Sequence, residues 1–258
     1  MSGIMVSIMA ELKKALKSAT LPVTFVVSAL VPLMMCFMMF VLKNPELSHK
    51  LGLLGAKAKL AGSADWPSFL TLFSQGVCGI EIVVFGFVFS WIFGREYVDR
   101  TIKDLLALPV PRYAVVMAKL SVAAVWCSAL YLFMYLVAMA GGFFVGLPLW
   151  DKAPAIVLLG RLLISSLAII YINSTVALLA SVTRGYLAAV GFVVLSAVFI
   201  NFAGAIGFGD YYPWAVPMNF AMKTGGVQPG LISWIIVLIT GAVGIAGTIG
   251  WWRYADHN

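Results

Sequence analysis

The stretch that decides the fold is residues 67–93, PSFLTLFSQGVCGIEIVVFGFVFSWIF. It is long enough to cross a bilayer as one helix, because about 20 apolar residues span a hydrocarbon core about 30 Å thick. Glu81 is its one charged residue. Five further apolar stretches lie at residues 21–42, 113–140, 156–181, 186–206 and 231–252. The sequence therefore predicts an all-α integral membrane protein, a single domain over residues 1–258 with six spans.

The composition excludes a soluble protein. Of the 258 residues, 62% are hydrophobic and 10% are charged, whereas soluble domains have about 45–50% and about 25%. The net charge of +7 fits basic residues that flank spans and meet anionic headgroups, and we prefer this to nucleic-acid binding. The three cysteines lie in apolar runs, so we expect neither a disulfide framework nor a metal site.

The N-terminal segment predicts a helix at the membrane surface. Apolar residues of segment 4–18 share one helical face, and Glu11 and three lysines occupy the other. Basic residues are more frequent on the side of this segment than on the opposite side, so we expect both termini in the cytoplasm.

The segment after the second span reads GREYVDRTIKDLLALPVPR, residues 94–112. Four apolar residues follow helical spacing, the charged residues lie off that stripe, and Pro109 and Pro111 stop the helix. We therefore expect a short amphipathic helix over about 95–107, with a charged face toward the cytosol. It is either a solvated connection or a docking element for a soluble partner.

This segment resembles the pattern that follows span two in ABC-2 type transporter permeases. The matching positions are Glu96, Thr101, Leu105, Leu106, Pro109, Val110, Arg112 and Lys119. Two positions depart, since the family commonly has Gly where Arg100 stands and Ser where Pro111 stands. The six-span layout with an N-terminal amphipathic helix is similar as well.

The resemblance implies the permease subunit of an ABC exporter. Two permeases, identical or siblings, would pair with separate ATP-binding subunits, which hold ATP and Mg. Residues 52–57 are the nearest approach to a phosphate loop, and their spacing is wrong. We therefore expect no catalytic, cofactor or metal residue in this chain. The similar short-chain members act in resistance to bacitracin-like and lantibiotic peptides, so the expected substrate is a peptide antibiotic, a drug or an amphiphile.

The resemblance also implies two contacts with the ATP-binding subunit. The 95–107 helix would be the coupling helix, and the turn at 183–186 the second, smaller contact. The residues expected to couple are Glu96, Asp99, Arg100, Thr101, Lys103, Asp104, Arg112 and Arg184.

Polar residues inside the spans are candidates for the translocation pathway. Glu81 is costly in a membrane if it is ionised, so it either lines a wet pathway or is a protonated carboxyl bonded to a neighbouring helix. Gln75, Asn173 and Asn201 are further candidates. The alternative function is a proton-coupled secondary transporter that uses Glu81, although no internal repeat supports it. A membrane-embedded enzyme is disfavoured, because no other acidic residue or histidine lies near Glu81 in the spans.

Overall fold

The computed structural model describes residues 3–44, 63–102, 110–222 and 228–255, and these residues form helices and short connections without a strand. The helices are α1 (Gly3–Leu16), α2 (Thr20–Lys43), α5 (Trp66–Val98), α7 (Arg112–Val145), α8 (Lys152–Ile172), α9 (Ser174–Val182), α10 (Leu187–Ala205), α11 (Ala215–Met222) and α12 (Leu231–Tyr254).

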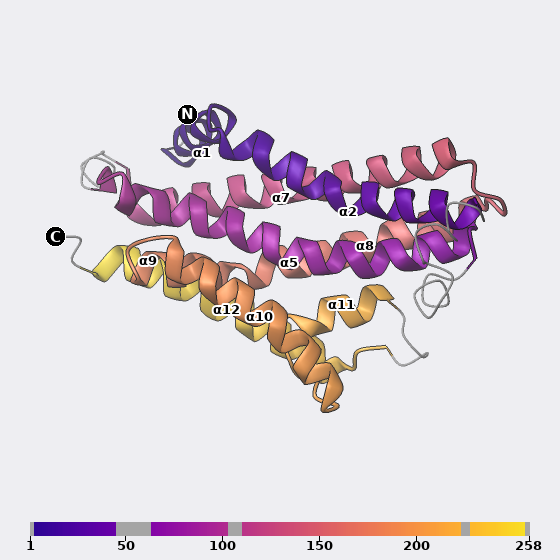
Figure 1. Cartoon of the computed structure of the whole chain (residues 1–258). Helices are drawn as coiled ribbons and strands as arrows, with labels where there is room; N and C mark the ends of the chain where they lie inside the picture. The colour runs from indigo at the N-terminus through magenta and orange to yellow at the C-terminus, as the bar shows by residue number, and fades with distance from the viewer. Residues whose placement is uncertain (1–2, 45–62, 103–109, 223–227, 256–258) are drawn as a thin grey trace.

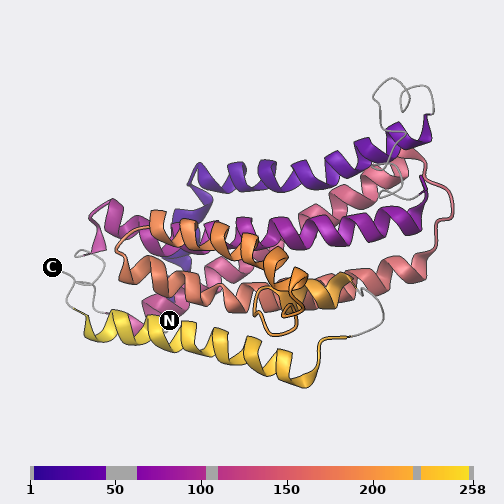
Figure 2. The same cartoon turned by 60° about the horizontal axis from the view of Figure 1, so that its bottom comes forward.

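Six helical segments are long and apolar enough to cross a membrane, with α8 and α9 forming one of them. This confirms the predicted number of spans. The long helices run side by side, with α1 at one end and the short helix α11 toward the other (Figure 1, Figure 2). We call these the α1 end and the opposite end of the bundle.

Side-chain and backbone caps set the ends of several helices. Asp65 caps α5 by accepting a hydrogen bond from the backbone N–H of Ser68 at 2.8 Å, and Asp151 caps α8 through Ala153. Gly146 ends α7 in the left-handed conformation, with φ 66°.

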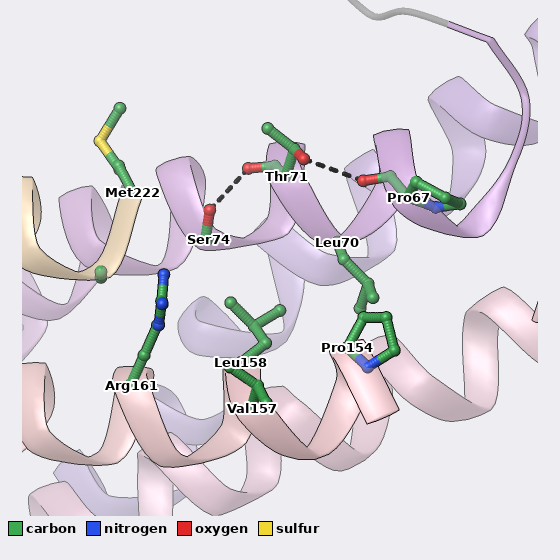
Figure 3. Close-up of a pocket in the computed structure, with 10 residues that line it drawn as sticks. Pro67, Leu70, Thr71, Ser74, Pro154, Val157, Leu158, Arg161 and Met222 are labelled. Atoms are coloured by element: carbon green, nitrogen blue, oxygen red, sulfur yellow. Dashed lines mark hydrogen bonds between the residues drawn. The ribbon is translucent and has the colours of Figure 1, made fainter. Parts of the chain in front are cut away.

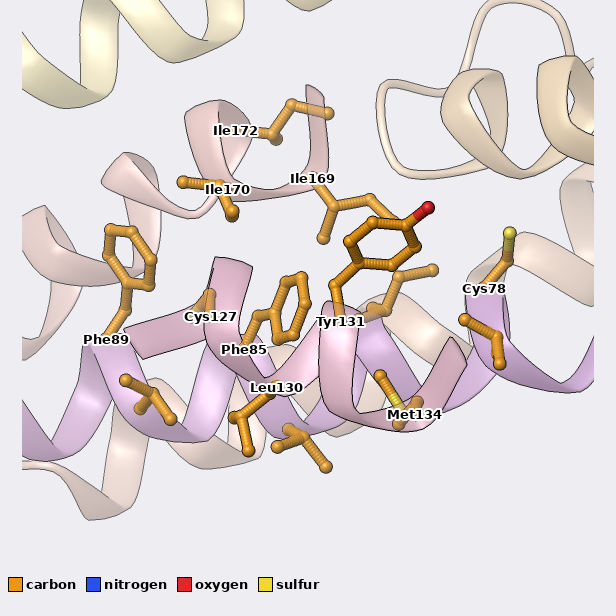
Figure 4. Close-up of a cluster of buried hydrophobic side chains, with 14 of the residues drawn as sticks. Cys78, Phe85, Phe89, Cys127, Leu130, Tyr131, Met134, Ile169, Ile170 and Ile172 are labelled. Carbon is orange, nitrogen blue, oxygen red and sulfur yellow. The ribbon is translucent and has the colours of Figure 1, made fainter. Parts of the chain in front are cut away.

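The central helix is α5, which contacts α2, α7, α8, α9, α10 and α11. Its buried side chains pack against those of α7 and α8 in a cluster that contains Phe85, Phe89, Leu130, Tyr131 and Ile169 (Figure 4). The tyrosine hydroxyl is satisfied, because it donates to the carbonyl of Leu159 at 2.7 Å. The α5–α7–α8 interface is therefore a central part of the hydrophobic core.

The sequence also predicts two helices outside the spans, at residues 4–18 and 95–107. A helix is present at residues 3–16, and its position at the membrane surface stays a prediction. The expected separate helix at 95–107 is wrong at its start, because residues 95–98 complete α5 without a break. Residues 103–107 lie outside the described residues.

Candidate functional site

A buried cluster of charged side chains joins three helices at the α1 end. Lys119 of α7 is fully buried, and Glu11 of α1 and Glu96 of α5 are each 3% exposed. The Lys119 Nζ lies 3.1 Å from Glu11 Oε2 and 3.0 Å from Glu96 Oε1. One ammonium group therefore bridges two carboxylates that lie 85 positions apart in the sequence. We call Glu11, Glu96 and Lys119, together with Lys14 and Arg95, the ion cluster.

Two further cations complete the ion cluster. Arg95 Nη2 lies 3.2 Å from Glu11 Oε2, and its guanidinium also stacks over the Trp91 ring at 4.4 Å. Lys14 Nζ lies 3.0 Å from Glu96 Oε1 and is partly exposed. Lys14 Nζ also lies 3.4 Å from Glu11 Oε1, and Arg95 Nε lies 3.6 Å from Glu96 Oε1. Each buried carboxylate thus has three cationic partners, which offsets the large cost of removing charges from water.

The ion cluster connects α1 to the segment that leaves α5. Thr101, which is exposed after the end of α5, donates a hydrogen bond from its Oγ1 to Glu96 Oε2 at 2.5 Å. The same carboxylate forms the ion pair with Lys119. Lys119 also donates to the carbonyl of Ile92 at 3.3 Å. A displacement of residues 99–101 would therefore act directly on the contacts that hold α1 and α7.

The end of α5 is a Schellman turn with an arginine where glycine is usual. The backbone N–H of Thr101 donates to the carbonyl of Glu96 at 3.0 Å, and that of Arg100 to Tyr97 at 3.3 Å. Arg100 has φ 58°. The left-handed conformation is unfavourable by about 1–2 kcal/mol for a residue with a Cβ, so this exposed arginine holds a strained position.

The same turn recurs at the end of α9. The backbone N–H of Gly185 donates to Ala180 at 3.1 Å, and that of Arg184 to Ser181 at 3.3 Å. Arg184 is exposed and has φ 54°. At the ends of α7 and α10 the left-handed residues are instead Gly146 and Gly207, at φ 66° and 79°.

The turn that contains Arg184 packs against α5 close to the end of that helix. A Cβ added to Gly94 of α5 would lie 2.5 Å from the backbone nitrogen of Tyr186 and 2.7 Å from the carbonyl carbon of Gly185. Only glycine permits this approach, so the last turns of α5 fix the position of the 184 turn. The Arg184 turn therefore contacts α5 six residues before Arg100, at the α1 end of the bundle.

Seven of the eight predicted coupling residues fall into three groups. Asp99, Arg100, Thr101 and Arg184 are exposed at the α1 end, as a docking surface requires. The expectation that Glu96 faces the cytosol is wrong, because long-range partners bury it. Lys103 and Asp104 lie outside the described residues.

Arg112, the eighth predicted coupling residue, makes a long-range structural contact. It is exposed, and its Nη1 donates to the carbonyls of Trp252 and Arg253 at 3.2 and 3.3 Å. This cation therefore satisfies orphan carbonyls at the C-terminus of α12. The contact joins the start of α7 to the last span, and a role in coupling stays a prediction.

The predicted pathway residues do not share one environment. Glu81 is fully buried and accepts a hydrogen bond from Ser166 of α8 at 2.7 Å, whereas its Oε2 has no partner among the described residues. Asn173 is buried between α8 and α9, while Gln75 and Asn201 are exposed on the surface of the chain. The structure thus separates two buried polar groups from two that face outward.

Sequence reasoning missed the partners within the ion cluster. Glu11 was expected on the solvated face of the N-terminal helix, and Lys119 was noted only as part of the pattern after span two. A signal exists in retrospect, because Lys119 lies well inside an apolar stretch where an unpaired ammonium is expensive. Its burial required an acidic partner, which the sequence could not place.

The six-span bundle defines a multi-pass protein of the cell membrane. Residues 7–204 match the family described as ABC-2 family transporter protein, and the chain therefore belongs to that family. It is similar to the bacitracin transport permease protein BCRB of Bacillus licheniformis, with 22% identity over 206 residues, which cover 76% of this chain and 99% of the relative. The chain is thus the membrane subunit of an ABC transporter, a class of permease that is not itself an enzyme and that partners an ATP-binding subunit.

Proposed function

We propose that this permease is part of an exporter that removes a peptide antibiotic, a drug or another amphiphile from the membrane and so confers antibiotic resistance. The bacitracin transport permease similar to this chain supports that substrate class. ATP and Mg are held by the partner subunit, and the substrate path is formed by this chain with a second permease.

The observation that carries the coupling of this permease to the ATP-binding subunit is the pair of arginines in left-handed turns at the α1 end. Arg100 and Arg184 each occupy a position that glycine would fill without strain. Strained residues of this kind cluster at functional sites. Both side chains are exposed, and their charge suits an acidic surface on the ATP-binding subunit. We infer that these two turns are the coupling contacts.

The test separates docking from stability. Arg100→Gly and Arg184→Gly should each raise the free energy of unfolding of the permease by about 1 kcal/mol, because the strain is relieved. Each should also weaken binding of the ATP-binding subunit by about tenfold or more, which corresponds to the loss of one charged contact of about 1.4 kcal/mol.

Leu149→Gly is the matched control. Leu149 is exposed at the opposite end and has φ 62°. Its replacement should stabilise the permease in the same way and leave binding of the ATP-binding subunit unchanged. If the two arginine variants bind that subunit as tightly as the original chain, the turns are not coupling contacts.

Pairing with a second permease is supported by an open face of the central helix. Thr71, Gln75 and Gly79 form an exposed row on α5 at helical spacing. Nothing lies within 4 Å of a Cβ added to Gly79. A polar row on a membrane helix that is otherwise buried suits close packing with another helix. Cross-linking between two copies through Gly79→Cys, in a chain without its three native cysteines, should trap a dimer, and a monomer alone would refute this pairing.

A further inference from the structure

A pocket of about 330 Å³ lies between α5, α8 and α11 (Figure 3). Its wall is largely apolar and includes Leu70, Val157, Leu158 and Met222. Ser165 of α8 donates to the carbonyl of Pro217 in α11 at 2.8 Å, and this buried bond fixes α11 against α8. The pocket is therefore built by packed helices.

Arg161 is the charged residue of this pocket. It extends from α8 toward α5, beside Met222 (Figure 3). Within the described parts of the chain, its side chain has neither a hydrogen bond nor an ion pair. Arg161 lies nine residues after Lys152 at the start of α8, or about 13 Å along the helix axis. A guanidinium within a membrane span is expensive without an anion. The described residues supply no such anion to Arg161, so the site can accept one from a ligand.

The remaining polar groups point to an anion that brings its own acceptors. The hydroxyl groups of Thr71 and Ser74 already donate to the carbonyls of Pro67 and Thr71, at 2.9 and 2.7 Å. The donors still open are thus those of Arg161, whose planar fork binds phosphate and carboxylate in two-point fashion. Apolar walls around one guanidinium suit an anionic head with hydrocarbon attached.

We propose that this pocket binds the phosphate group of a membrane amphiphile, with Arg161 on the phosphate and the apolar wall along the first methylene groups of its chains. A phosphate is chosen because Arg161 belongs to a helix that is long and apolar enough to cross a membrane, and lipid headgroups are the anions at the ends of such a helix. The proposal does not rest on the export function, since binding to the isolated permease is what it claims.

The experiment measures ligand retention by the purified full-length permease in mild detergent, using native mass spectrometry. Three probes separate the sources of the chemistry: dioctanoyl phosphatidic acid, dioctanoylglycerol, which lacks the phosphate, and inorganic phosphate, which lacks the chains. We expect retention of the phosphatidic acid alone. Equal retention of dioctanoylglycerol would overturn the role of the charge, and equal retention of inorganic phosphate would overturn the role of the apolar wall.

Variants test the residue itself. Arg161→Gln should weaken phosphatidic acid binding at least tenfold, and Arg161→Lys should weaken it less. Lys152→Gln, which removes an exposed cation from the same helix, should leave binding unchanged. Thr71→Trp should reduce binding by filling the pocket from an exposed position without changing any charge. Undiminished binding by both the Arg161→Gln and the Thr71→Trp variants would place the lipid elsewhere and refute the site.

Discussion

Replacing Lys119 with methionine tests the ion cluster most sharply. Methionine keeps the length of the apolar stem and removes the charge. Lys119 is fully buried and faces two carboxylates at 3.0 and 3.1 Å. At an effective dielectric constant near 20, each attraction is about 5 kcal/mol before desolvation. Removal of one buried partner typically costs about 3–5 kcal/mol, and we expect that loss because Glu11 and Glu96 then repel each other.

The assay is reversible unfolding of the permease in mixed micelles, with the free energy of unfolding measured for each variant. Lys17→Met is the control, because Lys17 is exposed on α1 and its loss should change stability by less than about 0.5 kcal/mol. Adding Glu11→Gln to Lys119→Met should recover about 1–3 kcal/mol, since the repulsion between the two carboxylates disappears. If Lys119→Met costs less than about 1 kcal/mol, the ion cluster does not hold α1 to the bundle.

Three further substitutions test other contacts. Gly94→Ala should destabilise the permease by about 1–3 kcal/mol, because its Cβ would press on the backbone of the 184 turn. Gly250→Ala, with open space around it, should be neutral or slightly stabilising. Equal effects of the two substitutions in the unfolding assay would contradict the close contact. Hydrogen bonds from the Ser63 hydroxyl and the Ser68 N–H lower the pKa of Asp65. The cap therefore stabilises the fold fully above the ordinary pKa of 3.8, and this stabilisation is lost as the pH falls through the lowered pKa. In a pH series of melting temperatures, Asp65→Asn should remove that acid dependence, and an unchanged slope would point to another group. Glu81→Gln keeps an acceptor for Ser166 and should alter transport more than assembly, so a fall in stability alone would mark Glu81 as structural.

The spans were predictable because hydropathy alone decides them. A continuous apolar stretch of about 20 residues has one stable arrangement in a bilayer, since its backbone groups must be paired internally. The six apolar segments predicted from the sequence correspond to the six long helices of the structure. The break at Asn173 was not predicted, because a turn with nearly helical dihedral angles leaves no mark in composition.

The candidate site was predicted only in its local parts. The spacing of four residues between Glu96 and Arg100 favours a helical ion pair, which is worth about 0.2–0.5 kcal/mol. The structure instead gives Glu96 partners on α1 and α7, at much greater separation in the chain. Buried long-range ion pairs outweigh an exposed local pair, and one sequence does not reveal which distant residues meet. The same holds for Arg161, whose pocket needs three helices to form.

The central claim is that this chain is a permease driven by a separate ATP-binding subunit. The most direct measurement is affinity purification of the tagged protein from its native membranes in mild detergent, followed by an assay of ATP hydrolysis. We expect a stoichiometric soluble subunit and ATP hydrolysis that an exported peptide or amphiphile stimulates. A permease recovered repeatedly without a partner and without ATP hydrolysis would contradict the account and favour proton-coupled transport through Glu81.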